Sequence, residues 1–300
     1  MHEQPSTPPK YIDLHTHGLS GLDSRSIRPD EYLRLAETYA LHGTAAFLPT
    51  LFPGPIDAMR GQLAAISGAK ETQACTGYGA KILGAHLEGP FVNPLKCGAL
   101  PKEFFILPTE DNIARLFDGF EDIVRIVTIA PELPGALRAI DQLTEAGIRV
   151  NMGHSDATAG QARDGQTAGA TGVTHLFNAM PGIHHREPGL AGFALTEDSL
   201  FVEIIADFAH IHPDMLKVVL RCKPADRIIL VSDSLLEAKL PSSPPNGPRY
   251  VPGTATLAGS GISLADAVAN IISLGIPEET ALSFAIDNPA SYLRTAPDNR

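Results

Sequence analysis

Two histidines separated by a single residue, His15 and His17, are the first side chains in the sequence whose spacing suggests metal binding. Side chains at positions i and i+2 of a β-strand point to the same side, so both imidazoles can reach one ion. Further groups able to bind a divalent cation follow later in the chain: Glu88, His154, His175 and Asp233. Imidazole and carboxylate ligands without thiolates are typical of a catalytic zinc ion, or a similar divalent metal, with an open coordination position. Two such histidines without other ligands nearby are more often hydrogen bonded or solvated than bound to a metal. The prediction of a metal site therefore depends on all these residues meeting in space.

Short apolar or β-branched segments, each followed by a segment with helical spacing, can bring those residues together. We expect strands at residues 11–17, 43–50, 81–89, 124–132, 148–155, 172–180, 201–210 and 227–234. Eight strands that alternate with helices predict an α/β fold of the (β/α)8 TIM-barrel type, with an open doubly wound sheet as the alternative. The candidate ligands stand at the carboxyl ends of the strands, where such barrels carry their active sites, and this favours the barrel. We assign residues 11–300 to a single barrel domain and residues 1–10 to a flexible N-terminal arm.

The charge of the chain excludes several classes of partner. Its 34 acidic and 23 basic residues give a formal net charge of -11, which repels nucleic acid and anionic membranes. No apolar run approaches the roughly 20 residues that span a bilayer, and the first residues lack the apolar segment of a signal peptide. The three cysteines, Cys75, Cys97 and Cys222, form no paired motif, which suits a reduced, cytoplasmic protein.

Polar residues near the candidate ligands have less specific interpretations. His86 shares a strand face with Glu88 and is expected to pack inside the barrel or to support the ligands. His210 ends the seventh strand and faces the barrel mouth, where we expect a substrate contact. Ser155 and Asp156 are expected to cap the helix after the fifth strand, so they do not indicate a serine nucleophile.

Nine short motifs are distributed over nearly the whole chain. They are IDLHTHG (12–18), GAHLEGPFVNP (84–94), APE (130–132), GHSDAT (153–158), THLFNAM (174–180), REPGLAG (186–192), IADFAH (205–210), SDS (232–234) and TLAGS (256–260). The combination of HLEGP with THLFNAM and REPG is specific. In these motifs, from residue 11 to about residue 293, the sequence resembles the N-acetylglucosamine-6-phosphate deacetylases of the amidohydrolase superfamily.

The resemblance implies a role for each matching residue. Glu88, His154 and His175 match the ligands of the principal metal, and His15 and His17 match those of a second one. The expected cofactor is therefore one or two divalent ions per subunit, with zinc as the expected metal. Asp233 matches the general base and acid. The matching substrate contacts are Ala99, Asn178, Ala179, Arg186, His210, Leu257, Ala258 and Gly259. In the family this arginine reaches the active site of the neighbouring subunit, which implies a homodimer.

The sequence also departs from the family pattern. Family members carry a small β-sandwich built from both chain ends, and we expect it to be absent because this sequence starts at the first strand and stops after the last helix. Leu100 replaces a histidine that polarises the substrate carbonyl, and a second ion at His15 and His17 is expected to take over that role. Phe208 replaces a glycine, and SDS replaces the common TDA.

The resemblance implies a hydrolase that converts N-acetylglucosamine-6-phosphate to glucosamine-6-phosphate and acetate. The expected partner is therefore a small amino-sugar phosphate. Two alternatives stay open: an amidohydrolase that acts on another N-acyl substrate, and a weakly active relative that binds a sugar phosphate.

Overall fold

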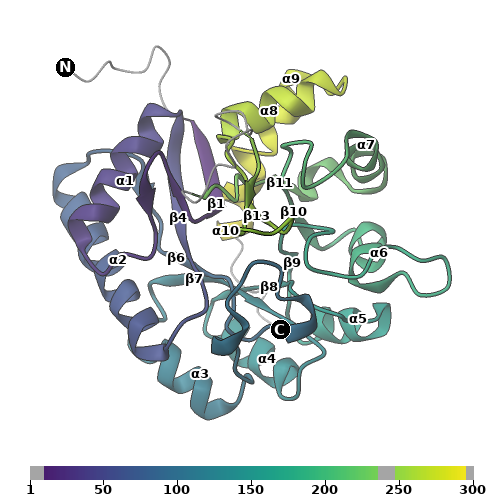
Figure 1. Cartoon of the computed structure of the whole chain (residues 1–300), viewed down its shortest axis with the longest axis horizontal. Coiled ribbons are helices and arrows are strands. Elements are labelled where there is room, and N and C mark those ends of the chain that lie inside the picture. Colours follow the sequence, from purple (N-terminus) through teal and green to yellow (C-terminus); the bar gives the residue numbers. More distant parts are fainter. Residues whose placement is uncertain (1–9, 236–246, 295–300) are drawn as a thin grey trace.

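A computed structural model of the chain describes residues 10–235 and 247–294. Nearly all of the predicted N-terminal arm, residues 1–10, therefore lies outside the described residues. Parallel strands occupy the centre of the molecule, and helices surround them (Figure 1).

The strands form one main sheet with the order β1-β4-β6-β7-β8-β9-β10-β11, and β5 pairs with β4. These strands are β1 (Tyr11–Thr16), β4 (Thr44–Leu51), β5 (Lys81–Ile82), β6 (Ala85–Leu87), β7 (Val124–Ile129), β8 (Arg149–Met152), β9 (Gly172–Val173), β10 (Phe201–Ile204) and β11 (Ile228–Leu230). All eight predicted strands are present at the predicted places, although most are shorter, and the third is divided into β5 and β6. The predicted (β/α)8 barrel is confirmed.

Most strands are followed by a helix, as a barrel of this kind requires. The helices are α1 (Pro29–Leu41), α2 (Ile56–Thr76), α3 (Glu110–Phe117), α4 (Ala136–Glu145), α5 (Ala159–Thr167), α6 (Gly189–Thr196), α7 (Pro213–Cys222), α8 (Leu264–Ser273), α9 (Glu278–Ser283) and α10 (Asp287–Arg294), with 3-10 turns η1 (Pro94–Lys96), η2 (Lys102–Phe104) and η3 (Ala225–Arg227). None of the helices in the described part of the chain has the length and apolar character needed to cross a bilayer. Thr158 and Gln161 cap the first turn of α5 reciprocally, so the prediction that Ser155 and Asp156 cap this helix is wrong.

Backbone hydrogen bonds join the first and last strands of the barrel. The N–H of Asp233 donates to the carbonyl oxygen of His15 at 2.9 Å, and the N–H of His17 donates to that of Ser234 at 2.9 Å. These bonds lie at the end of β1 and just beyond the end of β11. They therefore place His15 and His17 beside Asp233, although more than 200 residues separate them in the sequence.

Two short hairpins flank this junction. One pairs β2 (Gly18–Leu19) with β3 (Leu22–Asp23), and the other pairs β12 (Arg249–Tyr250) with β13 (Leu257–Gly259). The N–H of Ser260 donates to the carbonyl oxygen of Asp233 at 2.8 Å. This bond holds the β12–β13 hairpin against the end of β11.

Two apolar clusters fill the molecule. The larger one lies between the strands and the surrounding helices. The smaller one joins Leu14, Leu48, Ile126 and Ile229, which come from strands on different sides of the barrel, and includes Tyr292 of α10. Because β1 and β4 are separated in the sheet order from β7, and side chains from all of them meet in one cluster, this cluster is the packed interior of the barrel.

Candidate metal centre

Three of the predicted ligands meet at the carboxyl ends of β6, β8 and β9. The Oε1 atom of Glu88 lies 2.9 Å from Nε2 of His154 and 3.0 Å from Nε2 of His175, and the two nitrogens are 3.1 Å apart. All three side chains are buried. Nitrogen ligands about 2.0–2.1 Å from a tetrahedral zinc ion lie about 3.3 Å from one another, so this spacing is close to that of a first coordination shell.

A second group of possible ligands adjoins the first. The Nε2 atoms of His15 and His17 lie 3.3 Å apart, and they are 3.6 Å and 3.4 Å from Oδ1 of Asp233. The Nε2 of His17 also lies 3.1 Å from Oε2 of Glu88. Glu88 therefore stands between the two groups, each of which could hold an ion.

The hydrogen-bond partners of the histidines determine which ring nitrogen faces the centre as a lone pair. Nδ1 of His154 lies 2.9 Å from the carbonyl oxygen of Lys96, and Nδ1 of His17 lies 3.0 Å from that of Thr50. A carbonyl only accepts hydrogen bonds, so Nδ1 carries the hydrogen in both neutral rings. Each Nε2 lone pair then faces a carboxylate oxygen of Glu88, and two facing acceptors need a proton or a cation between them. The donor set therefore fits a divalent metal ion.

Burial and charge shift the acidity of these groups strongly. Burial raises the pKa of Glu88, but the charge of His15 and the hydrogen bonds from the surrounding histidines outweigh burial and hold this pKa well below its ordinary value. Burial lowers the pKa of His15, but the carboxylates of Asp233 and Glu88 hold it well above its usual range. The pKa of His175 is lowered, chiefly by burial. The cluster thus favours positive charge at its centre. Protons and a metal ion compete for the same ligand atoms there.

Unusual backbone conformations are concentrated around the cluster. Seven described residues other than glycine have positive φ, and six of these follow β8, β9, β10 or β11: His154, His175, Phe177, Ala179, Phe208 and Asp233. Each left-handed conformation costs roughly 1 kcal/mol or more for such residues. Strain of this kind is retained where the surrounding structure holds side chains in functional positions. At Phe208, the φ of +64° is a conformation that glycine adopts more easily, and the resemblance places a glycine there.

A cavity of about 210 Å³ opens over the cluster. It is lined by Phe52, Glu88, Gly98, Ala99, Leu100, His154, His175, Asn178, Ala179, His210, Asp233, Thr256, Leu257 and Ala258. Six of the eight predicted substrate contacts are therefore in this lining, beside three predicted ligands and Asp233. The lining also includes Leu100, which is apolar and buried.

The other two predicted substrate contacts lie outside this lining. Gly259 is packed beside Asp233, where an added Cβ would come within 2.7 Å of the Asp233 carbonyl oxygen. Arg186 is exposed in the loop before α6, which projects from the body of the molecule (Figure 1). Its Nη1 lies 3.0 Å from Nε2 of His185, so in this chain Arg186 does not reach its own cavity.

His210 is the histidine of the cavity that belongs to neither ligand group. Its Nδ1 lies 2.8 Å from Oδ2 of Asp207. Burial lowers the pKa of His210, but the hydrogen bond and charge of Asp207 outweigh burial, so this pKa is raised above its ordinary value. The raised pKa favours the protonated form of His210 at the wall of the cavity.

Sequence reasoning missed three residues that support the site. The ring of Phe52 stacks on that of His17 at 3.9 Å and lines the cavity. Glu203 contacts Nδ1 of His15 at 3.2 Å. Glu132 accepts hydrogen bonds from the backbone N–H of Asp156 and the side chains of Asn93 and Ser155. Only Glu132 had a sequence signal, because it belongs to the APE motif.

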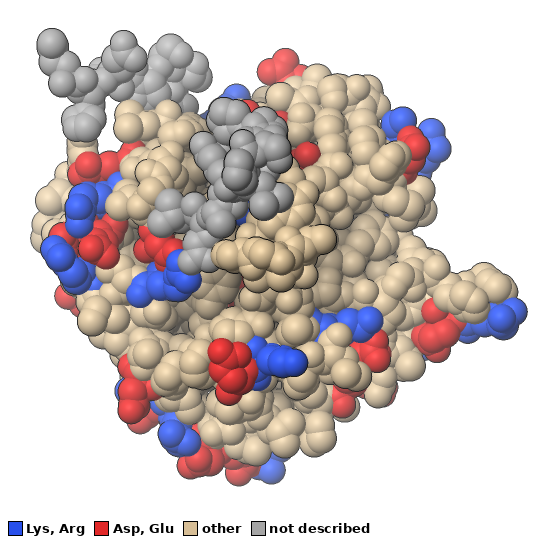
Figure 2. All heavy atoms as spheres, in the orientation of Figure 1, with Lys and Arg blue, Asp and Glu red and all other residues tan. Residues whose placement is uncertain are grey.

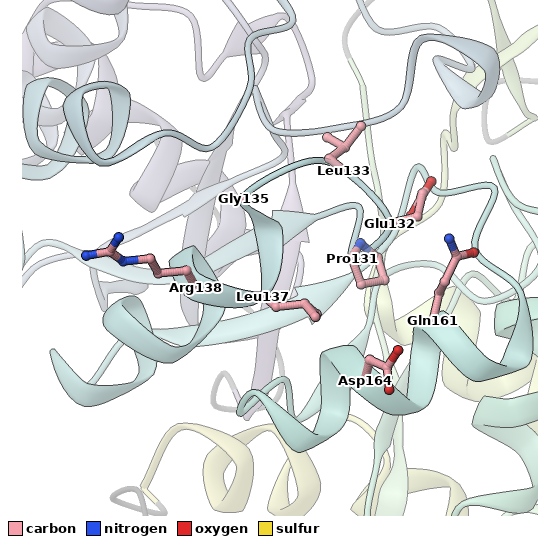
Figure 3. A pocket seen from close by; sticks show the side chains of 8 residues that line it. All are labelled: Pro131, Glu132, Leu133, Gly135, Leu137, Arg138, Gln161 and Asp164. Atoms are coloured by element: carbon pink, nitrogen blue, oxygen red, sulfur yellow. The ribbon is translucent and has the colours of Figure 1, made fainter.

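Glu132 also lines a second hollow, which lies between the loop after β7 and helices α4 and α5 (Figure 3). This hollow measures about 280 Å³ and includes Arg138, Gln161 and Asp164 in its wall. Among the described residues, no group that could hold a metal ion includes a residue of this wall. On the face shown in Figure 2, charged side chains lie mostly around the periphery and both signs are interspersed.

Comparison with known proteins gives close similarity over most of the chain. The chain is 36% identical to an N-acetylgalactosamine-6-phosphate deacetylase of Escherichia coli O157:H7, over 95% of this chain and 77% of that protein. It is 34% identical to an N-acetylglucosamine-6-phosphate deacetylase of Vibrio furnissii, over 95% of this chain and 73% of that protein. No family model matches the chain.

A solved structure is also similar. It is a mutant N-acetyl-D-glucosamine-6-phosphate deacetylase of Mycobacterium smegmatis in complex with N-acetyl-D-glucosamine-6-phosphate, which superposes with a TM-score of 0.84. The two sequences are 31% identical, and the superposition covers 98% of this chain and 80% of the other.

Proposed function

Because this chain belongs to the N-acetylglucosamine-6-phosphate deacetylase family, we propose that it hydrolyses the acetamide of N-acetylglucosamine-6-phosphate to give glucosamine-6-phosphate and acetate. It is a metal-dependent amidohydrolase. One observation carries the proposal: the carboxylate of Asp233 and the Glu88–His154–His175 group face the same cavity.

Glu88, His154 and His175 would hold the principal ion, and His15 and His17 would hold a second one beside Asp233. When bound, a divalent ion supplies a Lewis acid for the substrate carbonyl and lowers the pKa of water. Zinc is our proposed metal because every ligand is an imidazole or a carboxylate.

Asp233 would act as the general base and then as the general acid. Its carboxylate accepts a proton from the attacking water and delivers it to the leaving amine as the C–N bond breaks. The support is its position, within 3.4 Å to 3.6 Å of the His15 and His17 nitrogens and at the wall of the cavity.

The sugar and phosphate would occupy the rest of the cavity. His210 is raised in pKa and faces it, while Ala99, Asn178, Ala179, Leu257 and Ala258 shape its walls. We propose that Arg186 of a neighbouring subunit adds a cation to this site in a homodimer. The exposed position of Arg186 on a projecting loop supports this arrangement, and its planar guanidinium suits phosphate oxygens.

Three free cysteines support a reducing compartment, which we propose to be the cytoplasm.

A second candidate substrate is N-acetylgalactosamine-6-phosphate, because the similar protein of Escherichia coli O157:H7 carries the corresponding name. The two sugars differ only in the configuration at C4, so the same chemistry serves both. The walls of the cavity would decide between them.

Acetate release separates these possibilities. Zinc-loaded protein is incubated with N-acetylglucosamine-6-phosphate, N-acetylgalactosamine-6-phosphate and unphosphorylated N-acetylglucosamine, and Asp233→Asn serves as the inactive control. We expect the highest kcat/KM for N-acetylglucosamine-6-phosphate. A higher value for the galactosamine compound would support the second candidate, and failure to hydrolyse any of the three would overturn the proposed function.

A further inference from the structure

A buried carboxylate lies behind His15, on the side of the ring away from the ligand cluster. Glu203 belongs to β10 and is 2% exposed. Its Oε2 lies 3.2 Å from Nδ1 of His15, and its Oε1 accepts a hydrogen bond from Nδ2 of Asn151 at 2.8 Å. A buried carboxylate is stable only when its oxygens are satisfied, so Glu203 depends on both partners.

The contact determines how His15 presents its other nitrogen. An ionised carboxylate only accepts hydrogen bonds, so Nδ1 of His15 carries the hydrogen. In the neutral ring, Nε2 then has the lone pair, and this is the atom 3.3 Å from Nε2 of His17 and 3.6 Å from Oδ1 of Asp233. The opposite tautomer would point an N–H at these groups and could not bind an ion.

Glu203 is itself held by a chain of polar contacts through the barrel. The Oδ1 of Asn151 accepts a hydrogen bond from the hydroxyl of Tyr292 in α10 at 2.5 Å. Gly172, the register partner of Asn151 on β9, leaves the space for this pair. An added Cβ at Gly172 would lie 2.7 Å from the Tyr292 hydroxyl oxygen and still closer to Asn151. Asn151 of β8 therefore holds the carboxylate directly, whereas Tyr292 contacts only the far side of the Asn151 amide.

We propose that Glu203 is a positioning residue that orients His15 for the second ion, with Asn151 as its direct hydrogen-bond partner. The inference rests on the proposed role of His15 and His17 as ligands. When a carboxylate holds the second ring nitrogen of a ligand histidine, its removal typically lowers the metal affinity by about 10–100-fold.

Zinc binding to the metal-free protein, measured by competition with a chromophoric chelator, tests the proposal directly. Glu203→Leu keeps a similar volume but removes both acceptors, and we expect it to weaken the second zinc equivalent by about 10–100-fold. Glu203→Gln keeps one carbonyl acceptor, so its affinity should lie between those of the wild type and the leucine variant. The first equivalent, at Glu88, His154 and His175, should change by less than about threefold in both variants because Glu203 does not contact these residues.

Tyr292→Phe provides the matched control. It removes a buried hydroxyl from the same chain but leaves the contact between Glu203 and His15, so we expect a lower melting temperature with the second zinc affinity retained. Unchanged zinc affinity in Glu203→Leu, with a melting temperature lowered as in Tyr292→Phe, would show that Glu203 is only structural and would overturn the inference.

A His15→Asn/His17→Asn variant separates this inference from its premise. Loss of the second equivalent is expected, whereas two unchanged equivalents would refute the second site and the role of Glu203 together. Acetate release is measured on the same samples. A normal Glu203 effect without hydrolysis would overturn the proposed reaction alone.

Discussion

Replacement of Asp233 by asparagine isolates the proposed proton transfer from the architecture of the site. Asp233 has a φ of +45°, a left-handed conformation that asparagine tolerates better than most residues. Its backbone N–H and carbonyl oxygen make the bonds to His15 and Ser260, and neither bond involves the side chain. The variant should therefore keep the junction between the first and last strands.

The size of the effect follows from what the amide cannot do. General acid–base catalysis contributes about 100-fold to 10,000-fold to a rate, which corresponds to about 2.7–5.5 kcal/mol in activation free energy. An asparagine amide cannot accept the proton of the attacking water, so kcat should fall by this amount. KM should change little, because Asp233 is one of fourteen residues that line the cavity.

The assay is steady-state acetate release from N-acetylglucosamine-6-phosphate with zinc at saturation. Saturating metal is needed because Oδ1 of Asp233 is also close to His15 and His17 and could contribute to ion binding. Asp164→Asn, in the wall of the second hollow (Figure 3), is the matched control and should retain the wild-type rate. A kcat within about threefold of wild type in metal-saturated, folded Asp233→Asn would refute the assignment, since the expected minimum is about 100-fold.

Three further results are expected. Glu88→Gln removes the carboxylate charge that lies between both ligand groups, so zinc affinity measured by equilibrium dialysis should fall by at least about 10–100-fold. Retained zinc with full activity would contradict the ligand assignment. Arg186→Ala should raise KM for the phosphorylated substrate about 10–100-fold, as expected for loss of a charge-assisted hydrogen bond. The KM for the unphosphorylated counterpart should rise much less. Equal effects on both substrates would show that Arg186 does not bind phosphate. Because Asp207 holds the pKa of His210 above its ordinary value, the imidazolium should persist to higher pH, and KM for the phosphorylated substrate should rise as pH increases through that raised pKa. A His210→Gln variant should lose this pH dependence, and a profile unchanged by the substitution would exclude His210 as its source.

The sequence predicted the barrel and the convergence of the candidate ligands for one physical reason. Parallel strands of a barrel end at the same face, so chemically reactive residues at strand ends converge there whatever their separation in the sequence. Glu88, His154 and His175 were identified by this rule, and the structure brings their ligand atoms to within 3.1 Å of one another. The strand ends themselves were predicted too far along the chain. For example, β9 ends at Val173 and the following turn carries His175 in a left-handed conformation.

The supporting residues could not be predicted in the same way. Glu203 lies within a buried strand, and its function as a partner of His15 depends on which strands face each other across the barrel. Ser155 was expected to cap a helix from its local sequence, but its hydroxyl donates to Glu132 at 2.7 Å instead. In both cases the deciding interaction is a long-range contact, and local sequence preference contains no information about it.

The charge of the cavity bears on how a phosphate could be recognised. Glu88 and Asp233 contribute negative charge, and among the described residues that line the cavity none is lysine or arginine. A chain with a net charge of -11 repels a phosphate ester at long range, so attraction must come from nearby positive groups. Within one chain these are His210 and whatever cation the ligand groups hold. We propose that the exposed Arg186 of a second subunit adds a further cation from outside this lining and so increases the selectivity for phosphate.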